Sequence, residues 1–451
     1  MLGTHRSGKS HCPRLSRAGT LAVAVIIMLV AGAGFTQLAQ AQSYTLSVLF
    51  AFSNGPDGGS PHGVVLDSQG NVYGAAQNGG YFACGPRAGF SCGTVFKLDP
   101  SGHETVVHDF TGARGDGEQP LEGVIVDGQG NLYGATVAGG DLSCTQSGPF
   151  SNTDGCGMVF KIDPSGHETV LHEFTGLAGG GDGEAPYGAL VMDAGGNLYG
   201  TTYYGGSGSS TCTANGAQGC GTVFKIDPSG RETVLHKFTG ANGDGRTPEA
   251  GLVLDAQGNL YGTTCFGGSR NLGMVFKVDP SGHETVLYGF HGVAQGGTNG
   301  DGANPLGTLT FDAQGNLYGT TATGGDDSIG LGCFGLSFGC GTVFKLSPSG
   351  TETVLYRFTG TNGDGENAFG NVVFDAAGNL YGTTGYGGSG FGTAFKLDPA
   401  GHETVIHTFI AGEGGTPRDL VRDPQGNLYG TAEQYGSRQF GTVYKLTPSG
   451  Q

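Results

Sequence analysis

One short phrase, a variant of Gly-Asn-Leu-Tyr-Gly, occurs seven times in this chain. The copies begin at Gly70, Gly130, Gly196, Gly258, Gly315, Gly378 and Gly426, spaced 60, 66, 62, 57, 63 and 48 residues apart. A repeat of this length is typical of architectures that use one supersecondary unit again and again. The repeat therefore constrains the fold before any single residue is considered.

Each repeat unit contains four short apolar runs. In residues 167–230 they read HETVLHEF, YGALVMD, NLYGTT and GTVFKI. The turn DAGG joins the second run to the third, and DPSG joins the fourth to the next unit, which predicts two hairpins. No segment keeps a helical period of 3.6 residues. Four strands per repeat predict a β-propeller, and a solenoid is second choice because the capping repeats it needs are not seen.

The two ends of the chain predict how the ring closes. Residues 44–52, YTLSVLFAF, match an outer strand with no unit before them, while the last unit, ending in GTVYKLTPSGQ, lacks that strand. Joining the two would remove both unpaired edges, which otherwise favour aggregation. We therefore predict an all-β fold: a seven-bladed propeller of four-stranded blades over residues 42–451, closed by its N-terminal strand.

The first 41 residues have the pattern of a secretory signal peptide. Four basic residues precede the apolar run 18–35, and Ala39 and Ala41 occupy the small-residue positions of a cleavage site. A retained membrane anchor is the alternative, because the run approaches the ~20 residues that span a bilayer. We expect cleavage after Ala41 and a secreted, periplasmic or cell-surface protein whose mature part has no membrane span.

The net charge of the chain limits the kinds of partner that it is expected to bind. It contains 21 basic and 38 acidic residues, a net charge of −17, and losing the four basic residues of the leader brings the mature charge to −21. Nucleic-acid binding relies on Lys and Arg that neutralise phosphates. We therefore expect no nucleic acid and no anionic membrane surface as partner. We also expect a monomer.

The full wording GNLYGTT…GG…GTVFKLDPSGHETVLHxFTG resembles the GloVer-type tandem-repeat family of secreted bacterial proteins. The resemblance covers residues 43–451 and implies a propeller repeat without an established activity. It also implies a C-terminal surface anchor, which we do not expect here because the sequence closes on PSGQ. A looser similarity of LDAQGNLYG to NHL and gluconolactonase-type propellers concerns the fold alone.

Eight cysteines fall into close pairs within the long loops between GNLYG and GTVF. The pairs are Cys84/Cys92, Cys144/Cys156, Cys212/Cys220 and Cys333/Cys340. In an exported protein this spacing predicts four local disulfides. Zinc is disfavoured, because each loop offers two thiols and no nearby histidine. We expect Cys265, which is left over, to be a buried free thiol.

The repeated residues are predicted to serve architecture. Asp255, Gly258 and Asn259 and their equivalents should make a turn, while Leu260 and Tyr261 pack between blades. We expect the lysine of each FK(L/I/V) motif to lie across a hairpin from the glutamate of HETV. These motifs are therefore not assigned to catalysis.

The loops that connect one repeat to the next contain the sequence Gly-Asp-Gly, and they leave calcium binding open as an alternative. The recurring aspartates are Asp57, Asp116, Asp182, Asp244, Asp301 and Asp364. One carboxylate per loop is few for a shell of 6–8 oxygens. The outer-strand histidines are replaced by Tyr288 and Tyr356 in two repeats, which disfavours a metal there. We predict no metal site and no cofactor.

Residues that break the repeat are the candidate binding residues. Five places before the aspartate that ends each innermost run stand His62, Glu122, Gly188, Ala250, Gly307, Gly370 and Arg418. The ionisable three belong to blades one, two and seven, which are neighbours in a closed ring. Innermost strands begin at the face with the long loops, which predicts a ligand site at the channel mouth. Its residues are His62, Glu122, Tyr187, Glu249, Arg418 and Asp419.

The favoured function is a secreted, non-catalytic binding or scaffold protein whose loop-rich face binds a glycan or a protein, since binding sites favour loops on a rigid scaffold. An ion pair that only plugs the channel is the alternative for the charged residues. An extracellular hydrolase or lactonase, with acid–base work by Glu122, His62 or Asp419, is a second candidate function. A structural protein of the envelope or matrix is a third. No catalytic residue is assigned, because neither a Ser-His-Asp order nor a phosphate-binding motif is visible.

Overall fold

The computed structural model describes residues 43–81, 92–144, 155–177, 180–207, 212, 219–293, 300–325 and 339–449. The predicted signal peptide 1–41 lies outside the described residues, as do Cys84 and Cys333. Strands and turns make up the regular structure of the described residues, which contain no α-helix. Correspondingly, no helix that could cross a membrane occurs among them.

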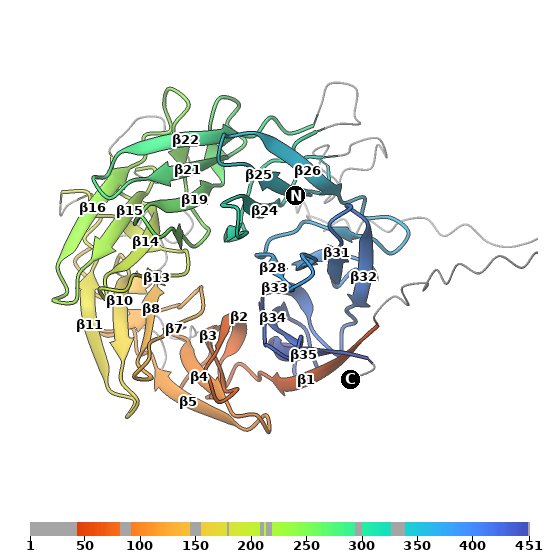
Figure 1. Cartoon of the computed structure of the whole chain (residues 1–451). Coiled ribbons are helices and arrows are strands. Elements are labelled where there is room, and N and C mark those ends of the chain that lie inside the picture. Colours follow the sequence, from red (N-terminus) through yellow and green to blue (C-terminus); the bar gives the residue numbers. More distant parts are fainter. Residues whose placement is uncertain are drawn as a thin grey trace, which may run out of the picture. The chain divides into compact units, whose positions relative to one another are not determined.

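Seven antiparallel sheets of four or five strands form the blades of a β-propeller, and three separate two-stranded sheets accompany blades two, four and six (Figure 1). Blade one contains β2 (Gly59–Leu66), β3 (Val72–Asn78), β4 (Thr94–Leu98) and β5 (Glu104–Asp109). Blade two contains β6 (Gly117–Glu118), β7 (Ile125–Val126), β8 (Leu132–Thr136), β9 (Ala138–Gly139), β10 (Met158–Ile162) and β11 (Glu168–Glu173). Blade three contains β12 (Glu184–Pro186), β13 (Val191–Met192), β14 (Leu198–Tyr204), β15 (Thr222–Ile226) and β16 (Glu232–Lys237).

The remaining blades repeat this order. Blade four contains β17 (Gly245–Arg246), β18 (Val253–Leu254), β19 (Leu260–Thr264), β20 (Phe266–Gly267), β21 (Met274–Val278) and β22 (Glu284–Gly289). Blade five contains β23 (Thr310–Phe311), β24 (Leu317–Thr321), β25 (Thr342–Leu346) and β26 (Glu352–Arg357). Blade six contains β27 (Gly365–Glu366), β28 (Val373–Phe374), β29 (Leu380–Thr384), β30 (Tyr386–Gly387), β31 (Thr393–Leu397) and β32 (Glu403–Thr408). Blade seven contains β33 (Gly415–Arg422), β34 (Leu428–Gln434), β35 (Thr442–Pro448) and β1 (Tyr44–Ala51). The separate two-stranded sheets are β6–β9, β17–β20 and β27–β30.

The ring closes through the N-terminal strand, as predicted. β1 pairs antiparallel with β35, from Tyr44 opposite Pro448 to Ala51 opposite Thr442. In Figure 1 the red β1 accordingly lies beside the blue β35. The first strand of the described chain thus covers the edge that the last repeat would leave unpaired.

The repeated Asp-x-x-Gly-Asn-Leu-Tyr phrase is a self-contained turn. Asp255 Oδ1 accepts the backbone N–H groups of Gln257 and Asn259 at 2.9 and 2.8 Å. Its Oδ2 accepts the Asn259 amide at 2.7 Å and the Tyr261 hydroxyl at 3.1 Å. Gly258 has φ +84°, which favours glycine at that place. The repetition of the motif is therefore architectural, as predicted.

Phenylalanine pairs hold neighbouring blades together. Phe238 at the end of the outer strand of blade three meets Phe276 of blade four edge-to-face, with ring centroids 5.1 Å apart, and both are fully buried. Equivalent aromatic pairs join all seven junctions, at 4.9 to 5.2 Å. Edge-to-face aromatic pairs add to the stabilisation that burial itself provides. Seven such contacts make each blade dependent on its neighbours.

The prediction for the repeated lysines is wrong. Lys277 lies opposite Tyr261 on one side and Thr285 on the other, whereas Glu284 lies opposite Val278. Successive side chains point to opposite faces of a sheet, so this register places the lysine and the glutamate on different faces. The Lys277 ammonium group lies over the ring of Tyr261, 5.8 Å from its centroid. The same arrangement recurs in the other six blades.

The innermost strand of every blade bends at one residue with positive φ, between +51° and +58°. These residues are Ser60, Gln119, Ala185, Thr247, Asn304, Asn367 and Thr416. Proline follows in six of the seven. A left-handed non-glycine residue is uncommon and costs free energy, so its repetition marks a constrained bend.

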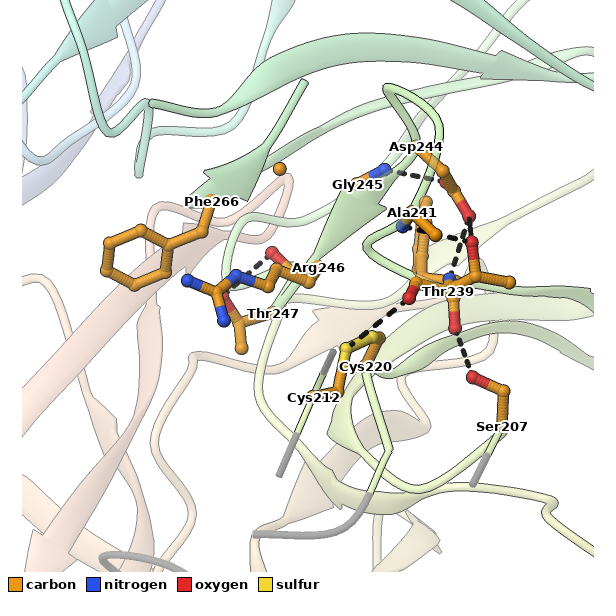
Figure 2. The surroundings of a disulfide bond; sticks show 12 residues. Ser207, Cys212, Cys220, Thr239, Ala241, Asp244, Gly245, Arg246, Thr247 and Phe266 are labelled. Carbon is orange, nitrogen blue, oxygen red and sulfur yellow. Dashed lines mark hydrogen bonds between the residues drawn. A yellow bond between two sulfur atoms is a disulfide. The ribbon is translucent and has the colours of Figure 1, made fainter. Parts of the chain in front are cut away.

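Disulfides close long loops within individual blades, and one of them lies against a crossover between blades. Cys144–Cys156 and Cys212–Cys220 form as predicted, and Cys92 and Cys340 are also disulfide-bonded. Cys212 Sγ lies 3.7 Å from the carbonyl oxygen of Thr239, which begins the crossover to blade four (Figure 2). The stapled loop and the crossover therefore share one face of the propeller. Cys265 is buried and free, in agreement with the prediction.

Candidate functional site

Two of the predicted site residues lie in a β-bulge. In blade seven Pro417 pairs with Ala432 and Leu420 pairs with Gly430, so that Arg418 and Asp419 together face one residue of β34. A bulge inserts an extra residue and turns side chains away from the regular alternation. Blade one has a register shift at the corresponding place, between His62 and Val64. Ionisable side chains thus lie at or beside a bulge in each of these neighbouring blades, His62 in blade one and Arg418 and Asp419 in blade seven.

Four of the six predicted residues line one cavity. His62, Glu122, Arg418 and Asp419 come from three blades and meet there, with Phe369, Thr308 and backbone of blades four and five completing the wall. The centre of a water molecule can occupy about 20 Å³ of this cavity, so the cavity has room for one or two waters. The cavity itself therefore accommodates a single small group rather than a whole sugar ring.

A buried ion pair occupies one side of this cavity. The Arg418 Nε–H donates to Glu433 Oε1, and the guanidinium group lies over the ring of Phe369, 5.3 Å from its centroid. His62 Nδ1 lies 3.4 Å from the same Glu433 oxygen. The side chains of Arg418 and Glu433 are 29% and 11% exposed, so the carboxylate of this ion pair is the more strongly shielded from solvent.

Burial and charge shift the pKa values of this group in opposite directions. Burial lowers the pKa of His62 to about 4, although Glu433 acts against it, so His62 is neutral near pH 7. Burial alone would raise the pKa of Glu433, but His62 and Arg418 outweigh it and hold that pKa below its ordinary value. Glu433 is therefore the ionised partner of Arg418.

The other two carboxyl groups behave differently. Burial raises the pKa of Glu122 well above its usual range, and the charge of Asp419 raises it further. Burial also raises the pKa of Asp419, against a hydrogen bond of 2.7 Å that the Asn371 N–H donates to its Oδ1. Two acidic groups that are costly to ionise thus lie at one cavity.

Tyr187 and Glu249 lie outside the lining of this cavity. Glu249 hydrogen-bonds with Cys265 and Tyr203 on the second strands of blades four and three, and burial raises its pKa to about 7. The rings of Tyr187 and Tyr203 are 5.5 Å apart between centroids. The charge of Arg418 acts on both Tyr187 and Glu249, so this polar cluster lies close to the first.

The small residues of the predicted row serve packing. A Cβ on Gly188 would come within 2.3 Å of the Ala250 carbonyl oxygen, and one on Gly307 would come as close to the Gly370 oxygen. Neighbouring innermost strands touch at these positions. Only residues with little or no side chain permit that approach.

The predicted row is not one structural row. In blades one and seven the turn aspartate comes seven positions after the residue with positive φ, as Asp67 does after Ser60. In the other five blades it comes eight positions after that residue, as Asp127 does after Gln119. Counting back from the aspartate therefore aligns His62 with Glu122. Counting forward from the bend aligns it with Leu121. The cavity brings the charged residues together in spite of this offset.

Sequence reasoning missed Glu433. The residue directly after the seven GNLYGTT phrases varies, and it reads Gln77, Val137, Tyr203, Cys265, Ala322, Gly385 and Glu433. The structure places several of these beside the channel, since Gln77 hydrogen-bonds with His62 and Glu433 pairs with Arg418. A charged residue in this second variable row was the signal that could have found it.

The sequence of the propeller matches one repeat family along its whole length. The Gloeobacter/Verrucomicrobia repeat matches residues 31–213, 210–332 and 329–451. The chain belongs to this family. The predicted family is thereby confirmed. Each of the three matched ranges in this Gloeobacter/Verrucomicrobia repeat protein spans more than one blade. No curated protein matches the sequence significantly.

Solved structures resemble this Gloeobacter/Verrucomicrobia repeat protein distantly. A gluconolactonase from Xanthomonas campestris is 14% identical, with a TM-score of 0.36 over 71% of this chain and 82% of that one. An extracellular domain assigned to a hybrid two-component system of B. thetaiotaomicron is 12% identical, with a TM-score of 0.49 over 90% of this chain but only 41% of that one. No site residue or activity is carried over from either protein.

Proposed function

We propose that this protein is a secreted, non-catalytic binding protein that recognises a polyhydroxylated ligand, such as a glycan, at the mouth of its channel. The observation that carries the proposal is the convergence of Glu122 and Asp419 on one small cavity. In the repeat, the equivalent places of most other blades hold glycine or alanine. Two carboxyl groups that depart from the repeat thus share one cavity, which supports a role in binding.

The chemistry of the cavity suits hydroxyl groups. Carboxylate oxygens accept hydrogen bonds, and sugar hydroxyl groups donate them. Burial and the neighbouring carboxyl groups make the ionised form of Glu122 unfavourable. A hydrogen-bond donor from a ligand would stabilise that ionised form. Because the cavity is narrow, one hydroxyl or hydroxymethyl group would enter it while the rest of the ligand contacts the loops above.

The compartment is part of the proposal. Disulfides such as Cys212–Cys220 form and persist in oxidising compartments. They support export of the chain by the signal peptide predicted at residues 1–41. Loops carried by a rigid scaffold are common places for binding surfaces.

The test is binding of the purified protein to a broad glycan array, beside three variants. Glu122→Gln and Asp419→Asn keep the shape of each side chain but remove its charge. Gln257→Ala changes an exposed turn residue at the other end of the innermost hairpin and serves as the control. We expect glycan binding by the wild type and the control, and its loss in both cavity variants. Binding that all four proteins share would place the site elsewhere.

A hydrolase is the second candidate, and one observation favours it. Pairs of carboxyl groups with perturbed pKa values in a cavity are characteristic of acid–base catalysis, and Glu122 and Asp419 form such a pair. A panel of chromogenic glycosides and lactones distinguishes the two functions. Turnover that disappears in Glu122→Gln would favour the enzyme, and absence of turnover together with array binding would favour the binding protein.

A further inference from the structure

Between blades, on the outer side of the propeller, side chains from three different segments meet. At the first junction they are His108 of β5, Asp116 of the crossover and Glu168 of β11. The same trio recurs at the third junction as His236, Asp244 and Glu284. In both trios one ligand atom from each residue lies within 4.8 Å of the other two.

The spacing in the first trio is that of a metal site. His108 Nε2 lies 3.6 Å from Asp116 Oδ1 and 3.6 Å from Glu168 Oε2. Ligand atoms at about 2.0–2.2 Å from a tetrahedral Zn²⁺ are about 3.3–3.6 Å apart. At 3.6 Å a nitrogen and an oxygen are too far apart for a good hydrogen bond. The two oxygens thus lie within ion-pair distance of the histidine, and the three atoms also have the spacing of ligands around one ion.

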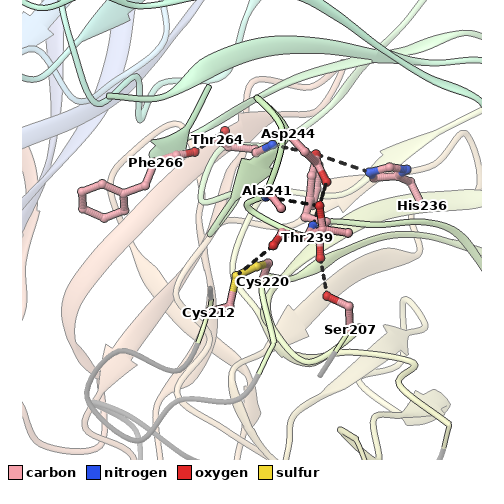
Figure 3. A network of polar contacts seen from close by, with 11 residues as sticks. Ser207, Cys212, Cys220, His236, Thr239, Ala241, Asp244, Thr264 and Phe266 are labelled. Carbon is pink, nitrogen blue, oxygen red and sulfur yellow. Dashed lines mark hydrogen bonds and ion pairs between the residues drawn. A yellow bond between two sulfur atoms is a disulfide. The ribbon is translucent and has the colours of Figure 1, made fainter. Parts of the chain in front are cut away.

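The aspartate of each trio is held in place by its own loop. Asp244 Oδ2 accepts the backbone N–H and the hydroxyl of Thr239 at 2.7 and 2.6 Å, and its Oδ1 accepts the Gly245 N–H at 2.6 Å. His236 Nε2 approaches the same Oδ1 from the other side, at 3.7 Å (Figure 3). Hydrogen bonds that orient a ligating carboxylate are a usual part of metal sites.

Both trios contain buried polar atoms without a hydrogen-bond partner among the described residues. In the first they are His108 Nε2 and Glu168 Oε1, and in the third His236 Nε2 and Glu284 Oε1. The equivalent glutamate oxygen is unpaired at the junctions where tyrosine replaces the histidine as well, as in Glu352, so the histidine nitrogens are what sets the trios apart from those junctions. Buried polar atoms normally have a hydrogen-bond partner, because leaving one unpaired costs free energy.

The chain contains its own comparison. At the fourth and fifth junctions tyrosine replaces the histidine, and its hydroxyl donates to the crossover aspartate. Tyr288 Oη lies 2.6 Å from Asp301 Oδ2, and Tyr356 Oη lies 3.2 Å from Asp364 Oδ2. There the aspartate gains a direct hydrogen bond that the histidine does not make at the first and third junctions. A tyrosine hydroxyl thus closes the space that a histidine leaves open.

We propose that His108, Asp116 and Glu168, and likewise His236, Asp244 and Glu284, each bind one divalent transition-metal cation of the Zn²⁺ type. An imidazole nitrogen with two carboxylate oxygens suits such an ion, whereas Ca²⁺ prefers an all-oxygen shell. The ion would join the outer strands of adjacent blades. This structural role is independent of ligand binding at the channel mouth.

The test is Zn²⁺ binding by the purified protein after removal of metals with a chelator. The variant H108Y/H236Y introduces the residue that the chain itself uses at the fourth and fifth junctions, so the fold is expected to persist. The control H103Y/H283Y changes two exposed histidines of the HETV motifs. Isothermal titration counts the bound ions, and Co²⁺ absorption in the visible range reports tetrahedral nitrogen–oxygen coordination.

We expect H108Y/H236Y to bind two Zn²⁺ ions fewer than the wild type, each single variant one fewer, and the control as many as the wild type. Ca²⁺ should not compete. Equal Zn²⁺ binding by wild type and H108Y/H236Y would overturn the proposal. So would the absence of Zn²⁺ binding, which would mean that a proton on the histidine, and not a metal ion, balances the two carboxyl groups.

Discussion

Arg418 and Glu433 form an ion pair between adjacent strands of blade seven, the blade that closes the ring. Arg418 enters the channel from the bulge of β33, and Glu433 reaches it from the end of β34. Both lie beside His62 of blade one. The ion pair therefore lies where the first and last repeats of the chain meet.

The first prediction concerns the energy of this ion pair. Arg418→Ala leaves Glu433 buried without its cation, and we expect a loss of about 3 kcal/mol in the free energy of unfolding. Arg418→Met with Glu433→Met removes both charges and should be much less destabilising. Urea unfolding of Arg418→Met, Glu433→Met and the double variant gives the coupling energy. Additive losses would show that the two residues do not interact.

The second prediction is an acid sensitivity caused by His62. Its pKa in the folded protein is about 4, against an ordinary value of 6.5. Folding therefore favours the neutral imidazole, and this stabilisation is complete above pH 6.5 and is lost as the pH falls through 4. The loss amounts to about 3 kcal/mol at most.

His62→Gln cannot be protonated and should lose less stability than the wild type between pH 6.5 and 4. Urea unfolding at pH 7.5, 5.5 and 4.5 measures the difference. The exposed His103→Gln is the control, and it should follow the wild type. Parallel pH curves for wild type and His62→Gln would contradict the low pKa of His62.

The third prediction concerns Glu122. Its pKa in the folded state is raised by burial and by Asp419, so folding favours the protonated carboxyl group. The associated stability is complete below the ordinary pKa of glutamate and is lost as the pH rises towards the folded pKa. Glu122→Gln stays neutral, so its melting temperature should exceed that of the wild type at pH 8 and approach it at pH 4.

Stability and binding should therefore move in opposite directions in Glu122→Gln. Loss of glycan binding in a variant that is more stable at pH 8 would show that the carboxyl group is retained for function. A melting temperature below that of the wild type at pH 8 would instead indicate that Glu122 is a structural charge.

The fourth prediction concerns a stapled loop. Replacing both Cys212 and Cys220 by serine opens a loop whose ends are 8 residues apart in sequence. The entropy of closing such a loop corresponds to about 2–3 kcal/mol. We expect a drop of this size in the free energy of unfolding, measured with urea. Cys265→Ser, which breaks no disulfide, is the matched control. Equal stability of the disulfide variant and the wild type would mean that the disulfide constrains only its own loop.

Much of the fold followed from the repeat. The turn formed by Asp255, Asn259 and Tyr261 is local, and its hydrogen bonds join residues at most six apart. Ring closure was predictable because one strand was spare at the start of the propeller and one was missing at its end. Such features depend on local spacing and on the requirement to pair edges, which the sequence displays directly.

The lysine prediction failed for a reason of register. Hydrophobic pattern and turn wording identify the hairpin, but one residue of shift decides whether Lys277 faces Glu284 or Thr285. The hairpin also carries a register shift between Val275 and Phe276. Pairing within a hairpin is therefore set by packing along the whole strand.

The sequence by itself determined the number of blades, their strand order, the closing strand and the local disulfides, because these depend on contacts between near neighbours in a repeated unit. Only the tertiary structure decided that Arg418 pairs with Glu433, and that His108 and Asp116 are joined by Glu168 of the next blade. These contacts depend on a bulge and on the packing of one blade against another. Contacts of this kind join residues at no fixed separation along the sequence, so a repeated spacing does not reveal them.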